Sequence, residues 1–405
     1  MKSFFPFFLF FFIVSCGSLE NLSLADPDPG TDVEEGREAV FLFGTDFVSS
    51  GQLYTADFEF ASTLANTGVT GLGSSAVIRL FDGLLTILHD GFSIGSSDNL
   101  QILNPSDLST LNQWSTGNGT NPQDVVLVGN MAYITLYDPD GDADNVDSEG
   151  HPADLIVMNI DTGAIEKRIS FFNFLNDDDS RNGRADCLVY VDPFLYVCLQ
   201  DLDGAFFEHN TAGLIGVVNT GTNAIEEVIT LEGRNPVDMA YSADEERLYV
   251  ALQAPYDFTL GNFDTSNAFG GVEIVPLADS ANTVLLVDET LGGYIERVEA
   301  SDGKVFVVAS EMDPATFEFT SEILSMASDN ETVDGVDVFV GESSDVRDIA
   351  ADTEGRLWVS RRQISADDGS ASDPRVDVFN IGTGELVSST MEPEVPVTSI
   401  AIGEI

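Results

Sequence analysis

Short apolar runs alternate with polar turns along most of this chain. In "NPVDMAYSADEERLYVALQ" (235–253), an apolar run, a polar turn and a second apolar run follow one another. Residues 121–138, 295–310 and 346–362 repeat this arrangement, as does "ADCLVYVDPFLYVCLQ" (185–200), whose turn is Asp192-Pro193. Runs of this length that flank a turn predict antiparallel β-hairpins.

The hairpins recur at intervals of 48 to 62 residues, with a weaker copy at 75–90 and a first half alone at 395–405. Between them lie further pairs of apolar runs, at 154–171, 213–231 and 375–391, each joined by a polar turn that contains glycine. Each repeat therefore holds four short strands. Four-stranded units at this spacing are typical of β-propeller blades.

The two ends of the repeat region complement each other. The C-terminal segment supplies one strand, and the region from residue 38 supplies three strands before the first complete repeat. We therefore predict an all-β fold over 38–405: a seven-bladed β-propeller closed by the C-terminal strand joining three N-terminal strands. Such closure removes the unpaired sheet edges that promote aggregation.

The segment "NTGTNAIEEVITLEGRNPVDMAYSADEERLYVALQ" (219–253) resembles the YVTN-type repeat of bacterial seven-bladed propellers. The similar features are the Asn-x-x-Ile strand, the Gly-x-Asn-Pro entry and Leu-Tyr-Val-Ala. The resemblance is good over 120–362 and is specific for the fold. It implies a secreted or surface-attached protein that serves as a binding scaffold.

The N-terminus has the pattern of an export signal. Lys2 precedes an apolar run that is too short to span a membrane, so we assign 1–15 to a signal peptide. "IVSC" resembles the bacterial lipobox, which implies lipidation of Cys16; the alternative is an ordinary signal peptide with a chance cysteine. Residues 16–37 are acidic and predict a flexible tether. We expect an exported lipoprotein on the outer membrane or cell surface, with the periplasm as the alternative.

The cysteine count supports export. There are three cysteines, so lipidation of Cys16 leaves Cys187 and Cys198 as a pair. A hairpin centred on Asp192-Pro193 places these two opposite each other, at a distance that a disulfide tolerates. A slip of one residue in the hairpin register would separate them.

The chain is strongly acidic. It has 69 acidic and 16 basic residues, for a net charge of −53. This charge excludes nucleic acid as a partner, because its phosphates need cations. It also excludes electrostatic attachment to anionic lipid, so the only membrane contact we expect is through the lipid anchor. It is compatible with bound Ca²⁺.

Two loops have ligand spacing suited to Ca²⁺. The first has alternating carboxylates and a later glutamate: Asp138, Asp140, Asp142, Asp144 and Glu149. This resembles the order of ligands in a Ca²⁺-binding loop, but Ala143 occupies the position of the usual glycine. The second loop offers Asp178, Ser180, Asn182 and Asp186 and lacks the twelfth-position ligand. The alternative is that both are solvated acidic loops.

A further set of charged residues opens the inner strands of the repeats at corresponding places: Asp124, Asp186, Asp238, Arg297 and Asp348. We predict that these side chains ring the mouth of the central channel. Such carboxylates could hold a metal. The structural alternative is that each accepts backbone amides of the next blade and fastens the ring.

Catalytic motifs are absent from the sequence. There is no zinc-type Cys/His cluster and no Gly-x-Ser-x-Gly elbow, and the three histidines lie in different repeats. We therefore predict a monomeric module that binds a protein or a glycan through one face, where the long loops and their aromatic residues gather. The alternative is a metal-dependent hydrolase or lyase, similar to propeller lactonases, that acts at the channel mouth.

The calcium hypothesis predicts a stabilising effect. Because Ca²⁺ would bind the folded state only, millimolar Ca²⁺ should raise the thermal midpoint, as measured by circular dichroism against a Mg²⁺ control. An unchanged midpoint would rule out both loops as calcium sites.

Overall fold

The computed structural model describes most of the chain from residue 38 onward. The described ranges are 38–45, 51–59, 61–81, 83–90, 98–175, 183–201, 211–257, 262–267, 269–316, 318–364, 371–387 and 390–405. The signal peptide, Cys16, the tether 16–37 and the candidate ligands Asp178, Ser180 and Asn182 lie outside these ranges. Within them, no helix is long and apolar enough to cross a membrane.

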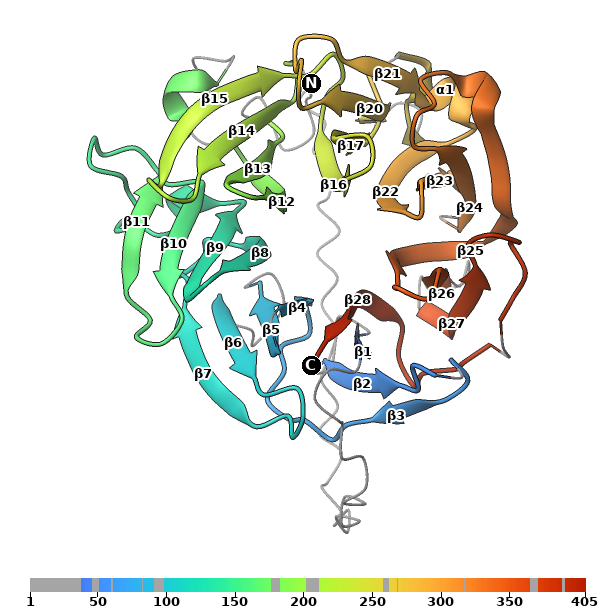
Figure 1. The fold of residues 1–405 in the computed structure, drawn as a ribbon, viewed down its shortest axis with the longest axis horizontal. Coiled ribbons are helices and arrows are strands. Elements are labelled where there is room, and N and C mark those ends of the chain that lie inside the picture. The colour runs from blue at the N-terminus through green and yellow to red at the C-terminus, as the bar shows by residue number, and fades with distance from the viewer. Residues whose placement is uncertain are drawn as a thin grey trace, which may run out of the picture. The chain divides into compact units, whose positions relative to one another are not determined.

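Antiparallel sheets follow one another around a central axis, as in a β-propeller (Figure 1). One four-stranded sheet contains β28 (Val397–Glu404), β1 (Glu38–Gly44), β2 (Gln52–Ala56) and β3 (Leu64–Asn66), in that order. In it, β28 pairs with β1 from Glu404 opposite Glu38 to Ser399 opposite Phe43. The predicted closing sheet, one C-terminal strand beside three N-terminal strands, is therefore present.

Four more sheets have four strands each. They contain β4 (Ala76–Phe81), β5 (Leu84–His89), β6 (Asn99–Leu103) and β7 (Thr110–Ser115); β8 (Pro122–Val128), β9 (Met131–Leu136), β10 (Leu155–Asn159) and β11 (Ile165–Ile169); β12 (Ala185–Val191), β13 (Phe194–Leu199), β14 (Leu214–Asn219) and β15 (Ala224–Thr230); β16 (Pro236–Ser242), β17 (Arg247–Leu252), β20 (Gly271–Pro276) and β21 (Val284–Val287).

The last large sheet has six strands: β22 (Tyr294–Ser301), β23 (Lys304–Met312), β24 (Phe319–Ala327), β25 (Val336–Ala351), β26 (Arg356–Ile364) and β27 (Ala371–Asn380). The 16-residue β25 pairs with β24 through Ser344 and with β26 from Asp345 onward. The structure thus has five separate four-stranded blades and one six-stranded sheet, where seven blades were predicted. The reason is that β25 continues through residues 341–345 from one sheet into the next.

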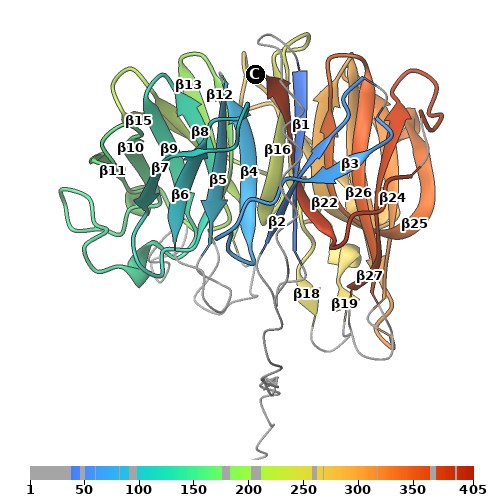
Figure 2. The same cartoon turned by 90° about the horizontal axis from the view of Figure 1, so that it is seen from below.

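The smaller elements lie in connections. β18 (Tyr256–Asp257) and β19 (Asn262–Phe263) form a two-stranded sheet on one side of the ring (Figure 2). The described residues contain one α-helix, α1 (Asp288–Leu291), and four 3₁₀ turns, η1 (Pro139–Gly141), η2 (Phe172–Phe174), η3 (Thr265–Asn267) and η4 (Val333–Gly335).

The core lies between neighbouring sheets. The second strands β5, β9, β13 and β17 are each buried at every residue after the first, because a sheet packs on both of their faces. Tyr133 and Leu155 of one sheet, for example, pack in one cluster with Leu195 and Val197 of the next. Each such side chain contributes about 1.5–3 kcal/mol on full burial.

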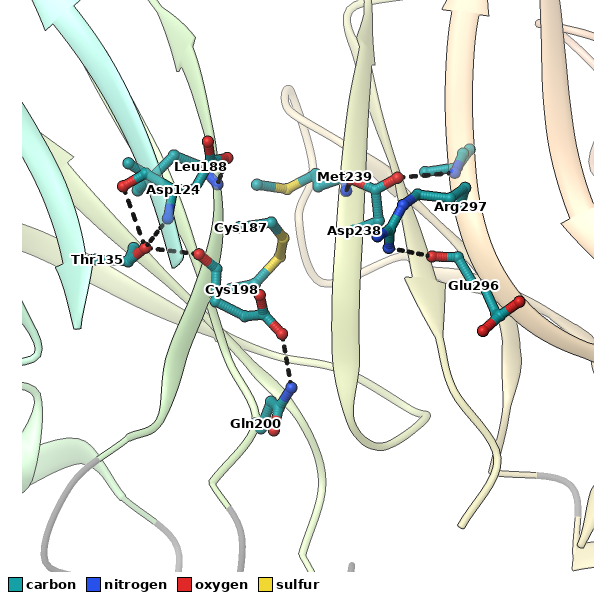
Figure 3. The surroundings of a disulfide bond; sticks show 12 residues. Asp124, Thr135, Cys187, Leu188, Cys198, Gln200, Asp238, Met239, Glu296 and Arg297 are labelled. Carbon is teal, nitrogen blue, oxygen red and sulfur yellow. Dashed lines mark hydrogen bonds between the residues drawn. A yellow bond between two sulfur atoms is a disulfide. The ribbon is translucent and has the colours of Figure 1, made fainter. Parts of the chain in front are cut away.

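The Cys187–Cys198 disulfide is present, with a Cα–Cα distance of 5.2 Å. Val191 lies opposite Phe194 and Tyr190 opposite Leu195, which is the register predicted from a turn centred on Asp192-Pro193. Figure 3 shows the bond beside the innermost strand β12. The register shifts between Ala185 and Leu188, and this bulge becomes important at the centre of the ring.

Candidate functional site: the central cavity

The innermost strands form a closed circle. β4, β8, β12, β16, β22, β25 and β28 contact one another in sequence, and β28 contacts β4. All seven contribute residues to one central cavity of about 290 Å³. Its charged lining consists of Arg79, Asp124, Asp238, Glu299 and Asp348.

A β-bulge near the start of the inner strand recurs around the circle. The pairing shifts before Val125, Leu188, Asp238, Arg297 and Asp348, and again in β28 near Thr398. Bulges redirect a side chain out of the regular alternation of a strand. Here they bring polar side chains to the seam between neighbouring inner strands.

Side chains at these bulges accept backbone amides of the following inner strand. Asp124 Oδ2 accepts Leu188 N at 3.1 Å, and Asp238 Oδ2 accepts Val298 N at 3.0 Å. Asp348 Oδ2 accepts Ile400 N at 2.7 Å. Ser399 Oγ continues the pattern by accepting Ile78 N at 3.1 Å, so the series crosses the junction between the chain ends.

Two of these aspartates also accept their neighbouring amide. Asp124 Oδ1 accepts Val125 N at 2.9 Å, and Asp238 Oδ1 accepts Met239 N at 3.0 Å. The inner strands that precede β8 and β16 in the circle offer no acceptor at the corresponding position. That position is Val77 in β4 and Cys187 in β12. Each buried amide thus finds a partner, as burial requires.

This alignment corrects one predicted member of the ring. Asp124 and Asp238 each immediately precede a residue whose backbone amide is bonded to a carboxylate. In β12 the residue with that amide is Leu188, so Cys187, and not Asp186, occupies the corresponding place. Asp186 instead accepts a hydrogen bond from Gln200 Nε2 at 2.8 Å. Burial raises the pKa of Asp186 to about 7, although the nearby Arg297 lowers it.

Two arginines balance part of the central negative charge. Arg79 Nη2 lies 3.1 Å from Asp124 Oδ1, and Arg297 Nε lies 3.8 Å from Asp348 Oδ1. Burial raises the pKa of Asp348 to about 6, while both arginines oppose the rise. Arg297, the predicted basic member of the ring, therefore links its strand to the next by charge, since it cannot accept an amide.

Glu299 differs from the three aspartates that line the cavity. It is partly buried, and the described part of the chain offers it no ion pair. Burial, reinforced by the charges of Asp238 and Asp348, raises the pKa of Glu299 to about 8. This side chain is therefore mostly a neutral carboxylic acid at pH 7.

Arg79 and Glu299 were not among the predicted site residues. Strand alternation could have indicated Glu299, since it lies two residues after Arg297 on the same strand and thus on the same face. Arg79 likewise lies two residues after Val77 on β4. Val77 corresponds to the ring aspartates but is apolar, so comparison of the repeats did not indicate β4.

The first predicted calcium loop is organised by other contacts. Asp138 Oδ1 pairs with Arg184 Nη1 at 2.8 Å. Asp142 accepts the amides of Asn118 and Asp144, at 3.1 and 3.0 Å. Glu149 is turned toward His151, with 3.9 Å between Oε2 and Nδ1.

Among the residues that the structure describes, no three acidic, histidine or cysteine side chains are grouped as a metal site. This holds for Asp138, Asp140, Asp142, Asp144 and Glu149 and for the central aspartates. Three ligands of the second loop lie outside the described ranges. The calcium site therefore stays a prediction.

Aromatic residues of one long loop are fixed to the body of the ring. Phe263 of β19 stacks on Tyr294 with ring centroids 3.9 Å apart, and Tyr256 packs edge-on against Phe263 at 5.5 Å. These two aromatic side chains thus position the β18–β19 sheet over the start of β22.

Comparison with known proteins relates the chain to others through its fold. No family model and no curated protein sequence matches it. A candidate 6-phosphogluconolactonase from Bacteroides fragilis superposes with a TM-score of 0.59 and 13% identity, over 93% of this chain and all of that one. A periplasmic gluconolactonase from Pseudomonas aeruginosa gives 0.60 and 12%, over 90% and 98%.

A dihydro-haem d1 dehydrogenase has a TM-score of 0.50 and 10% identity, over 89% of this chain and 74% of that chain. At these identities the similarity shows a common propeller fold, and function has to be argued from the site.

The amide contacts predict a large effect of removing one carboxylate. Asp238→Ala leaves the amides of Met239 and Val298 without their acceptor, which should lower the free energy of unfolding by about 2–4 kcal/mol. Urea unfolding followed by tryptophan fluorescence measures the change. Asp244→Ala, at an exposed turn, is the control and should stay within about 0.5 kcal/mol of wild type. Equal stability of the two variants would contradict the fastening role.

Proposed function

We propose that this protein is a lipid-anchored cell-envelope propeller that acts as a binding or scaffolding module for a protein or a glycan. The observation that supports it most directly is the use of the central carboxylates. Asp124 and Asp238 each bind two amides, and Asp348 binds one amide and faces Arg297. Carboxylates committed in this way stabilise the ring and leave little ligand capacity for a catalytic metal.

We infer further that the ring is sevenfold. Seven inner strands surround the cavity, and the two halves of β25 serve as the outer strand of one unit and the inner strand of the next. On this interpretation the six-stranded sheet corresponds to two blades, as the YVTN-type repeat would require. Partners would then bind at the long-loop face, with the tether holding the ring off the membrane.

A second candidate function is hydrolysis of a lactone or a related ester at the cavity. It is supported by Glu299, a neutral acid beside Arg79 in an otherwise charged cavity. A carboxyl group with a raised pKa can act as a general acid at neutral pH. Two of the similar folds belong to proteins described as lactonases.

The anchoring proposal predicts a covalent lipid on Cys16. When the full chain is produced in a Gram-negative host, a fatty-acid label should appear in wild type and be absent from Cys16→Ser, which should be found in the soluble fraction. Label retained by Cys16→Ser would contradict lipidation at this residue. Ser15→Ala, adjacent to it, is the control for altered processing.

The binding and hydrolysis proposals predict different results with the same purified protein. A binding module should retain a glycan from an array or a partner from an envelope fraction, and should leave δ-lactones intact. Lactone opening, followed by proton release in weak buffer, should stay at the uncatalysed rate. Turnover that is lost in Glu299→Leu and retained in Glu226→Gln, an exposed control, would favour the hydrolase instead.

A further inference from the structure

Hydrogen-bonding capacity in the central cavity is unevenly distributed. Asp124 and Asp238 have both carboxylate oxygens engaged with amides. Asp348 has Oδ2 engaged, whereas its Oδ1 lies 3.8 Å from Arg297, beyond hydrogen-bond distance. Glu299 lines the same cavity; within the described ranges it is in no ion pair, and it accepts only the amide of Ala300. The unused hydrogen-bonding capacity of the cavity therefore lies mainly on the side of Glu299 and Asp348.

The chemistry of this side selects against ions. An anion would meet the charges of Asp124, Asp238 and Asp348, with only Arg79 in the lining to offset them. A metal ion lacks a suitable group of ligands among the residues described. What the side offers is one carboxylic acid as donor, one carboxylate oxygen as acceptor and one guanidinium as donor.

Hydroxyl groups match such a mixture, because each can donate and accept. The apolar remainder of the wall, which includes Met239, Val298 and Ile349, offers a surface for the C–H face of a ring. The volume of about 290 Å³ is at the small end of ligand pockets, which admits one compact molecule.

We propose that the central cavity binds a small neutral polyhydroxylated molecule of monosaccharide size, held by Glu299, Asp348 and Arg79. This site lies at the centre of the ring. Polyol binding there does not depend on a macromolecular partner, so its absence would leave the scaffold proposal standing.

The protonation state of Glu299 gives the proposal a specific signature. The groups that face it are Asp238 on β16, Asp348 on β25 and Arg79 on β4, with Asp124 on β8 and Arg297 on β22 beyond them. When Glu299 ionises, its donor is lost and a further negative charge enters the cavity. Polyol affinity should then fall as pH rises through about 8.

The experiment is titration of the full chain with glucose and myo-inositol, followed by saturation-transfer NMR and calorimetry. Wild type should bind one of them with a dissociation constant in the roughly millimolar range at pH 6. At pH 9, where about a tenth of Glu299 stays protonated, binding should be about tenfold weaker. Glu299→Gln, which keeps a neutral donor, should bind at both pH values. Glu299→Leu should not bind at either, and Glu226→Gln should behave as wild type.

Three results would overturn the proposal. The first is no binding of either polyol by folded wild type at pH 6. The second is polyol binding that Glu299→Leu leaves intact, which would place it elsewhere. The third is binding of a probe cation such as ethanolammonium that strengthens with pH and is lost in Glu299→Gln, which would make the cavity a cation site. If Glu299→Leu fails to fold, the contrast between wild type and Glu299→Gln at pH 9 decides alone.

Discussion

The bond from a bulge carboxylate to an amide of the next inner strand is the interaction on which this architecture depends. A propeller has no covalent link between the inner strands of neighbouring sheets, and apolar packing between them is not directional. Asp124, Asp238, Asp348 and Ser399 add direction, because each fixes the height of the next strand by one hydrogen bond. These hydrogen bonds fix the positions of the inner strands relative to one another and thereby the size of the cavity.

The same interaction explains the electrostatics of the centre. Amides that point at a carboxylate favour its ionised form, so at Asp238 and Asp348 they oppose the rise in pKa that burial causes. The charge of these aspartates also acts on Glu299. Burial is the main cause of the raised pKa of Glu299; the charges of Asp238 and Asp348 add to the rise, and Arg79 and the amide of Ala300 oppose it.

The repeating pattern of the sequence was sufficient to predict the propeller, the closing sheet and the disulfide register, because each follows from local apolar alternation and turn chemistry. The count of separate blades differs at β25, which stays extended through two sheets although Gly341 and the serines after it are residues typical of turns. At the site, Asp124, Asp238 and Asp348 were found by repetition. Asp186 was misaligned by one residue because a bulge is invisible in a strand pattern, and Glu299 and Arg79 depend on convergence in space.

The continuous β25 also bears on how the ring deforms. A strand that runs unbroken from one sheet into the next makes those sheets a single stiff arc, without a hinge between them. Expansion of the circle must then concentrate at seams with fewer directional bonds. The seam between β12 and β16 is one of these, since Cys187 offers its neighbour no acceptor oxygen. Slow opening of the circle, as amide hydrogen exchange would detect it, should therefore begin at this seam, beside the disulfide.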